Sequence, residues 1–271
     1  MNGILNLDEV SLNYQSEIGE TQAIKNLSFT IKEGEFVAII GPSGSGKTSI
    51  LSMIAGLIKP SSGKILFKGK EVVKPIKEIG YMLQKDELFP WRTIEKNVYL
   101  PLEIKKLNNE KNRTFAKNLL TKYGLIDFLK AYPNEISGGM RQRAALIRTL
   151  AGNPEVLLLD EPFSALDYQT RLNVCDDVYK IIRQEKKTAI LVSHDIGEAI
   201  SMADRIIVLT KRPATILNEH YYFFDKDMLP LKRREQKGFG EKFETLWGEL
   251  NNEKWNDKFR KKKVFKKRVS F

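Results

Sequence analysis

The sequence has little of what marks an exported or membrane-embedded chain. It holds one cysteine, Cys175, so no disulfide can form within the chain, and this composition is typical of the reducing cytosol. No apolar run approaches the roughly 20 residues that span a bilayer. The N-terminal MNGILNLDEV lacks the basic region and apolar stretch of a signal peptide. We therefore expect a soluble, cytoplasmic protein.

Basic charge is concentrated at the end of the chain. The formal net charge is +11, and residues 254–271 contribute nine Lys or Arg against one Asp, which leaves only +3 for the rest. A near-neutral body argues against nucleic-acid binding by most of the chain. The tail, in which Trp255 and Phe259 stand among the basic residues, fits either a solvated end or a contact with anionic lipid headgroups.

Several apolar runs have the length of strands and little polar alternation. They are GEFVAII (34–40), EVLLLDEP (155–162) and KTAILVS (187–193), and DRIIVLT (204–210) indicates a further strand. Strands that are buried on both faces have this pattern, as in a parallel sheet covered by helices. We therefore predict an α/β fold with a mostly parallel sheet flanked by helices.

Other regions have different patterns. Residues 1–33 and 63–70 alternate between apolar and polar, which indicates a small antiparallel β layer, and residues 88–150 read as a helical insertion. Beyond about Leu217 the sequence pattern predicts no further strands. FGEKFETLWGEL (239–250) then places several apolar side chains on one helical face. The predicted division is a domain over 1–220 and a C-terminal helical extension with a basic tail over 221–271.

A glycine-rich loop follows the first of these strands and precedes the helical pattern SILSMIAGLI. It fits Gly41-x-x-x-x-Gly46-Lys47-Thr48, the Walker A pattern, in the strand–loop–helix context that a phosphate loop requires. The glycines let successive N–H groups point at phosphate oxygens. Lys47 would neutralise the β- and γ-phosphates, and the Thr48 hydroxyl would bind Mg²⁺. The predicted nucleotide-binding residues of this segment are Gly41, Pro42, Ser43, Gly44, Ser45, Gly46, Lys47, Thr48 and Ser49.

Polar residues follow two of the later strands. Asp160 stands at the carboxyl end of its strand, where open α/β sheets place their ligands, and its carboxylate can hold Mg²⁺ through water. Glu161 would accept a proton from the attacking water as general base. His194, after the strand at 187–193, could donate a hydrogen bond to the γ-phosphate. His220, in NEHYYFF, has no such context and is predicted to be structural.

A second candidate anion site lies in NEISGGMRQRAAL (134–146). Here Ser137, Gly138 and Gly139 precede a helical run, and the unpaired N–H groups of a helix N-terminus favour negative charge. Together with the glycine-rich loop at 41–48, this gives the chain two candidate phosphate sites, although one nucleotide requires only one such loop.

From about Leu5 to Leu217 these segments together resemble the nucleotide-binding subunit of an ATP-binding cassette (ABC) transporter. The segments occur in the family's order: ISGGM matches the signature motif, SALD (164–167) the D-loop, and YMLQKDELFPW the Q-loop. The resemblance implies ATP and Mg²⁺ as cofactors. It also implies further roles, with Tyr14 stacking on adenine, Gln84 acting in catalysis and on Mg²⁺, Asp167 in the nucleotide site, and His194 as the switch histidine.

The resemblance also implies partners. In this family two subunits pack head to tail, so that Ser137, Gly138 and Gly139 of one would bind the γ-phosphate held by the other. Separate transmembrane permease subunits would dock near Leu88, Phe89, Pro90 and Trp91, placing the chain on the inner face of the cell membrane. We expect these four residues to be exposed as an apolar contact, and the alternative is that they pack within the helical insertion. An extracytoplasmic solute-binding protein would take part indirectly.

One residue departs from the family pattern, since Met140 stands where glutamine is usual. Together with LFPW after the Q-loop, Met140 resembles the branch of importers for nitrate, sulfonates, taurine and related nutrients. The alternatives are an ABC ATPase that acts on nucleic acid or ribosomes, favoured only by the basic tail, and an inactive scaffold. The intact set Lys47, Asp160, Glu161 and His194 argues against the scaffold.

Overall fold

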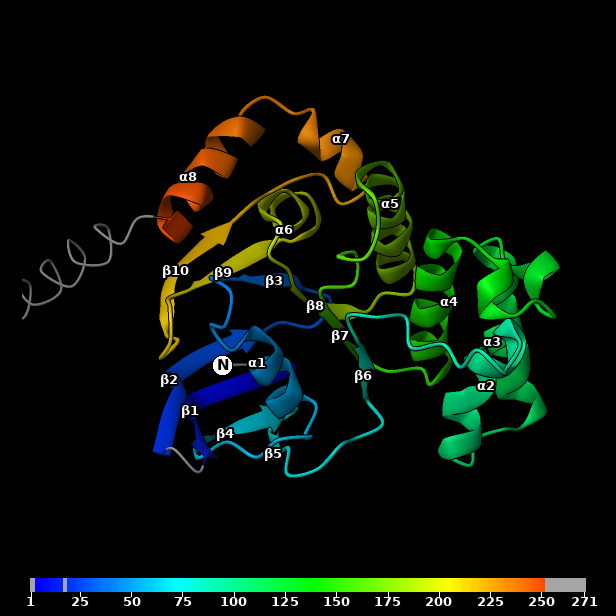
Figure 1. Cartoon of the computed structure of the whole chain (residues 1–271), viewed down its shortest axis with the longest axis horizontal. Coiled ribbons are helices and arrows are strands. Elements are labelled where there is room, and N and C mark those ends of the chain that lie inside the picture. Colours follow the sequence, from blue (N-terminus) through cyan, green and yellow to red (C-terminus); the bar gives the residue numbers. More distant parts are fainter. Residues whose placement is uncertain (1–2, 17–18, 252–271) are drawn as a thin grey trace, which may run out of the picture.

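The structure is a computed structural model that describes residues 3–16 and 19–251 (Figure 1). The predicted basic tail, 254–271, lies outside the described residues. The strands are β1 Leu5–Ser16, β2 Gly19–Ile31, β3 Phe36–Ile40, β4 Ser62–Phe67, β5 Lys70–Glu71, β6 Ile79–Met82, β7 Val156–Asp160, β8 Thr188–Val192, β9 Arg205–Leu209 and β10 Ile216–Tyr221. The α-helices are α1 Lys47–Ile54, α2 Ile94–Ile104, α3 Glu110–Lys122, α4 Gly138–Ala151, α5 Tyr168–Gln184, α6 Ile196–Met202, α7 Pro230–Arg234 and α8 Phe239–Asn251, with short 3₁₀ turns at Ile126–Phe128 and Pro133–Glu135.

A six-stranded sheet forms the centre of the fold, in the order β10-β9-β3-β8-β7-β6. All neighbouring pairs are parallel except β9 and β10. Every residue of β3, β7, β8 and β9 is buried, which explains why these strands read as continuous apolar runs. The predicted α/β fold with a mostly parallel sheet is confirmed.

The two faces of this sheet are covered differently (Figure 1). In β3, Phe36, Ala38 and Ile40 belong to a core with α5, α6 and the helical insertion. Val37 and Ile39 point to the other face, where α1 lies between the six-stranded sheet and a four-stranded antiparallel sheet of order β2-β1-β4-β5. The described parts of the alternating segments, β1 and β2 together with β4 and β5, therefore form the predicted antiparallel layer.

The predicted helical insertion contains α2, α3 and α4, which pack on one another beside β6 (Figure 1). The buried Asn97 side chain fixes the preceding loop, because it donates to the Phe89 and Arg92 carbonyls and accepts from the Phe89 N–H at 2.7 Å. Leu88 was expected to be exposed with its neighbours and is instead buried in the core. Phe89 and Trp91 are exposed and stack at 4.9 Å between ring centroids.

The expectation that strands end near Leu217 was wrong, because β10 pairs with β9 at the edge of the sheet. Its sequence ILNEHY is half polar, since an edge strand is only partly buried. The following helices cover the same core. Leu246 of α8 is fully buried, and His220 Nε2 lies 2.9 Å from Glu249 Oε2, joining β10 to α8.

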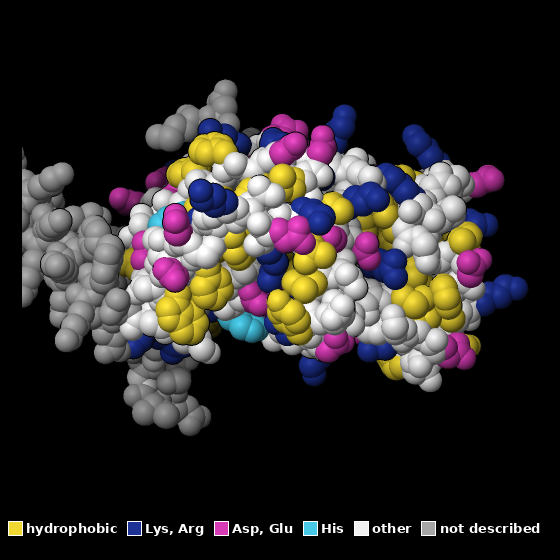
Figure 2. Space-filling model, turned by 90° about the horizontal axis from the view of Figure 1, so that it is seen from above, with side chains coloured by type: hydrophobic (Ala, Val, Ile, Leu, Met, Phe, Trp, Pro, Cys, Tyr) yellow, Lys and Arg dark blue, Asp and Glu magenta, His cyan; other side chains and the backbone are white. Residues whose placement is uncertain are grey.

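Acidic and basic side chains are interspersed over the face seen in Figure 2. Within residues 3–16 and 19–251, none of the helices has the length and apolar character that a membrane crossing requires.

Candidate functional site

Most of the predicted site residues meet at one edge of the central sheet. The carboxyl ends of β3, β6, β7 and β8 share this edge because the strands are parallel. The phosphate loop follows β3, Gln84 follows β6, Asp160 ends β7 and His194 follows β8. Residues that are more than a hundred positions apart in the sequence are thereby brought within hydrogen-bond distance.

The phosphate loop leads from β3 directly into α1. Gly44 and Gly46 have φ of 75° and 89°, in the left-handed region that favours glycine. This backbone directs the loop toward the open edge, and the N-terminal N–H groups of α1 follow it. The Ser45 hydroxyl is buried and has no hydrogen-bond partner in the part of the chain that the structure describes. The loop therefore retains donors that a phosphate could use.

Lys47 is folded back over this loop. Its Nζ donates to the carbonyls of Gly41 at 2.9 Å and Pro42 at 3.1 Å, and the side chain is buried. Burial lowers the pKa of Lys47, while the nearby carboxylates of Glu161 and Asp160 act in the opposite direction. The ammonium group therefore lies between the loop and two acidic groups, where phosphate oxygens could replace its carbonyl partners.

Two hydroxyl groups hold the Asp160 carboxylate. Thr48 Oγ1 donates to Oδ1 and Tyr81 Oη donates to Oδ2, both at 3.1 Å. Burial raises the pKa of Asp160, and the two hydrogen bonds oppose that rise. Burial also raises the pKa of Tyr81, so its hydroxyl remains a proton donor. Asp160 is thus oriented from both sides.

Glu161, His194 and Gln84 form a second polar group at the same edge. Glu161 Oε2 lies 3.1 Å from His194 Nδ1 and accepts a hydrogen bond from Gln84 Nε2 at 3.3 Å. The Glu161 backbone has φ of 45°, an uncommon value for a residue with a side chain. This φ takes Glu161 out of the extended backbone of β7, which ends at Asp160.

Tyr14 of β1 lies beside the first turn of α1. Its hydroxyl and that of Ser49 share a hydrogen bond of 2.9 Å, and its ring is 41% exposed. The ring is thus open to solvent next to the phosphate loop, as a residue that stacks on a base requires.

The structure does not bring the signature residues to the chain's own phosphate loop. Ser137 is exposed and caps α4, accepting from the Met140 N–H at 3.3 Å. Gly139 packs against α5, where an added Cβ would lie 2.9 Å from Val174. In Figure 1, β6 and β7 lie between α4 and α1. The Met140 side chain, which departs from the family pattern, packs against the core.

Asp167 belongs to the segment that connects β7 to α5. It caps α5 by accepting from the Thr170 N–H at 3.0 Å, and this backbone hydrogen bond lowers the pKa of Asp167. Among the described residues, no hydrogen bond joins Asp167 to the phosphate loop of the same chain.

Three residues that contact the site are not predicted by any sequence motif. Tyr81 bonds to Asp160, Arg212 donates to the Gly44 carbonyl at 3.0 Å, and Arg171 donates to the Leu166 carbonyl at 3.0 Å. The only available signal was position, since Tyr81 stands three residues before Gln84 on β6. Arg212 and Arg171 have no local pattern that predicts their contacts.

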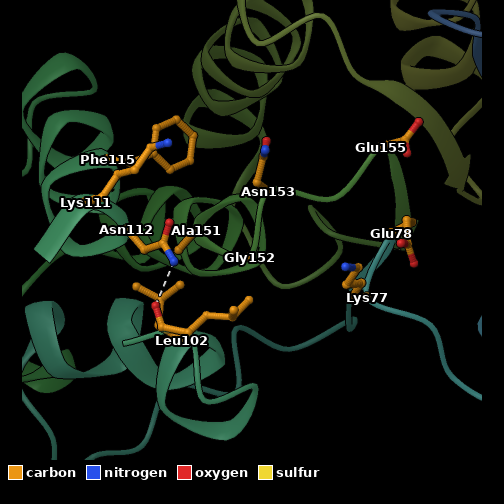
Figure 3. Close-up of a pocket in the computed structure, with 11 residues that line it drawn as sticks. Lys77, Glu78, Leu102, Lys111, Asn112, Phe115, Ala151, Gly152, Asn153 and Glu155 are labelled. Atoms are coloured by element: carbon orange, nitrogen blue, oxygen red, sulfur yellow. Dashed lines mark hydrogen bonds between the residues drawn. The ribbon is translucent and has the colours of Figure 1, made fainter. Parts of the chain in front are cut away.

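A hollow of about 560 Å³ lies elsewhere, between the helical insertion and the start of β6 (Figure 3). Its lining mixes Lys77 and Lys111 with Glu78 and Glu155, and includes none of the predicted site residues. It has no part in the chemistry predicted for the sheet edge.

A strand, a glycine loop and a helix, with a buried aspartate at the end of a neighbouring parallel strand, define a P-loop nucleoside triphosphatase. The comparisons extend this assignment. Residues 24–164 match the family model described as ABC transporter. YtlC of Bacillus subtilis (strain 168), an ABC transporter ATP-binding protein, is 48% identical over 251 residues, which cover 92% of this chain and 96% of YtlC.

Further relatives agree. The aliphatic sulfonates import ATP-binding protein SsuB of Bacillus cereus (strain ZK / E33L) is 41% identical over 213 residues, 78% of this chain and 83% of SsuB. The ATP-binding cassette MJ0796, solved as a dimer in a post-hydrolysis state bound to ADP and Pi, is similar with a TM-score of 0.69 and 34% identity, covering 81% of this chain and 100% of that one. The chain belongs to the ABC transporter family and is an ATP-binding subunit with transport-coupled ATPase activity.

Proposed function

We propose that this subunit powers solute import by closing head to tail on a second copy of itself around ATP. The position of the signature residues carries this proposal. Ser137 is exposed at the N-terminus of α4 and apart from its own phosphate loop, whereas Asp160, Glu161, Gln84 and His194 converge beside that loop. An anion site that cannot serve its own nucleotide can complete the site of a partner chain. The solved dimers of MJ0796, at 34% identity, support the association of two copies.

The arrangement at β7 also fits Mg²⁺. This ion is bound by one or two carboxylates together with substrate phosphates and water, and one hydroxyl and one carboxylate are already oriented here, with Thr48 Oγ1 3.1 Å from Asp160 Oδ1. Thr48, Asp160 and the Gln84 amide would hold the ion. When bound, Mg²⁺ neutralises charge that develops on the phosphates.

Within this site the remaining residues have separate tasks. Lys47 would exchange its contacts with Gly41 and Pro42 for the β- and γ-phosphates. Glu161 would take the proton of the attacking water, since its carboxylate lies at the sheet edge within hydrogen-bond distance of Gln84 and His194. His194, 3.1 Å from Glu161, would orient that carboxylate and contact the γ-phosphate.

The exposed Phe89–Trp91 stack supports a permease contact. Trp91 is 72% exposed and borders a hollow of about 530 Å³ that is also lined by Arg92, Tyr99 and Glu103. A pair of stacked aromatic rings beside charged residues is typical of the centre of a protein interface. Docking there would hold the subunit at the inner face of the membrane, with the solute-binding protein on the other side.

The transported solute is proposed to be a small anion of the sulfonate, nitrate or taurine type. The name of SsuB, at 41% identity, supports a sulfonate-like compound. Because the ATPase does not touch the solute, uptake assays with the assembled transporter must identify it.

The test of head-to-tail closure is complementation between two defective chains. Ser137→Arg places a cation in the partner's γ-phosphate site, and Lys47→Ala removes the charge that binds phosphate in its own site. A mixture of the two should contain one intact site per heterodimer and regain ATP-dependent dimerisation, while neither variant does so alone. Failure of the mixture, with subunit exchange verified by labelled chains, would contradict the proposal.

A lipid contact by the basic tail is a separate proposal that rests on its sequence. Each basic residue near an anionic membrane contributes about 1 kcal/mol, and the tail carries a surplus of +8. A chain truncated after Glu253 should lose binding to vesicles that contain phosphatidylserine, whereas the full chain should bind at low salt and dissociate at high salt. Equal binding by both chains would contradict the contact.

A further inference from the structure

A closed set of hydrogen bonds surrounds the switch histidine. Ser193 Oγ donates to Glu198 Oε2 at 2.6 Å and accepts from the Asp195 N–H at 2.9 Å, while Asp195 Oδ1 accepts from the Glu198 N–H at 3.0 Å. Ser193 and Glu198 are buried. His194 lies between Ser193 and Asp195, so this ring fixes the backbone that presents its imidazole to Glu161.

Arg171 connects this ring to the D-loop. It stands in the first turn of α5, directly after the D-loop, and its guanidinium donates to the Leu166 carbonyl at 3.0 Å. The same guanidinium lies 3.6 Å from Asp195 Oδ2 and 3.9 Å from Glu198 Oε1. One side chain thus spans two segments that are distant in the sequence.

The contact is incomplete in this conformation. Arg171 Nε is buried without a hydrogen-bond partner among the described residues, and both carboxylate distances exceed the usual 2.7–3.2 Å range of such bonds. A buried, unbonded N–H is costly, and one hydrogen bond to each of the two carboxyl groups, from Nε to Glu198 and from a terminal nitrogen to Asp195, would remove that cost. A movement of less than about 1 Å would complete the bonds.

We propose that Arg171 is a positioning residue that couples the D-loop to the switch histidine. This inference rests on the proposed function, in which the D-loop meets the second subunit. When the subunits close, displacement of Leu166 would bring the Arg171 fork onto Asp195 and Glu198 and fix His194 against Glu161. The partner's arrival would thereby be transmitted to the hydrolytic group without direct contact between the partner and His194.

The test compares variants of the full chain in ATPase assays. Arg171→Met removes the guanidinium, and Arg171→Lys keeps the charge but cannot donate from three separate nitrogens to Leu166, Asp195 and Glu198 at once. Lys180→Met removes a charge from the exposed side of the same helix and is the control. We expect Arg171→Met to lower kcat by about tenfold to a hundredfold, because a catalytic group misplaced by 1 Å can cost about a hundredfold in rate. KM for ATP should change less than about twofold, since nucleotide binding is not touched. The kcat of Arg171→Lys should lie between those of the wild type and Arg171→Met, and the kcat of Lys180→Met should equal that of the wild type.

A double-mutant cycle separates positioning from a general structural effect. Asp195→Asn retains a side chain that can cap α6 but removes the charge that Arg171 faces. If Arg171 acts through Asp195, the double variant should be no slower than Arg171→Met alone. Additive losses, or wild-type kcat in Arg171→Met, would overturn the inference. If Arg171→Met does not fold, Arg171→Lys takes its place in the cycle. Absence of ATPase activity in the wild-type chain would instead contradict the proposed function.

Discussion

Replacing Tyr81 with phenylalanine tests whether Asp160 is held ready for a metal ion. The change removes only the hydroxyl that donates to Asp160 Oδ2 at 3.1 Å, leaving the ring in β6. Residues that orient a metal ligand through a hydrogen bond alter metal affinity by 10–100-fold when removed. Because Thr48 still holds the other carboxylate oxygen, we expect the lower end, about a tenfold rise in the Mg²⁺ concentration for half-maximal activity, or about 1.4 kcal/mol.

The assay is a Mg²⁺ titration of ATPase activity at saturating ATP, paired with direct binding of Mn²⁺ in the presence of a non-hydrolysable ATP analogue. Tyr99→Phe is the matched control, since the Tyr99 hydroxyl donates to the Glu95 carboxylate at 3.0 Å away from the sheet edge. Tyr99→Phe should leave the titration unchanged. An unchanged titration for Tyr81→Phe as well would refute the reasoning that Asp160 binds the ion in the orientation that Tyr81 gives it.

Three further outcomes are expected. Burial raises the pKa of Glu198 to about 7 from 4.5, although Ser193 and the charges of Arg171 and Arg234 oppose this and Asp195 adds to it. Between these two values the folded chain keeps a proton that the unfolded chain releases. The free energy of unfolding should therefore fall by up to about 3 kcal/mol as the pH rises from 4.5 to above 7. Urea titrations should detect this fall in the wild type and not in Glu198→Gln. Leu246→Ala should lower the free energy of unfolding by about 3 kcal/mol, measured the same way, because this side chain is fully buried, whereas the exposed Trp247→Ala should change it by less than about 1 kcal/mol. Trp91→Ala should reduce capture of the permease by about 2 kcal/mol in binding assays while the isolated ATPase keeps its rate; equal capture would contradict docking at that surface.

The parts of the fold that the sequence predicts are those in which one physical requirement dominates. β3, β7 and β8 are buried on both faces, so their continuous apolar runs predict a parallel sheet. β10 was missed because an edge strand does not need such a run, and ILNEHY places His220 and Asn218 toward α8 rather than toward an apolar core. Leu88 has the same local sequence pattern as its exposed neighbours, because its burial depends on the tertiary core that it joins.

In the site, too, some residues are predicted by local sequence patterns and others are placed only by tertiary packing. The phosphate loop, Asp160 and Glu161 follow from local patterns, since strand ends and glycine loops place them. The contacts of Tyr81 with Asp160 and of Arg171 with Leu166 and Asp195 depend on how separate elements meet. No spacing rule predicts such contacts, because they are set by the register of β6 on β7 and by the start of α5.

Glu161→Gln tests the central claim most directly, because it keeps the shape of the site and removes the group that would accept the water's proton. The chain has a mass of 31.1 kDa, and light scattering after size exclusion with Mg-ATP should report twice that mass for this variant and one copy without nucleotide. Adding Lys47→Ala to the same chain should abolish the ATP-dependent dimer. A Glu161→Gln chain that stays monomeric with ATP bound, or that hydrolyses ATP at the wild-type rate, would contradict the account.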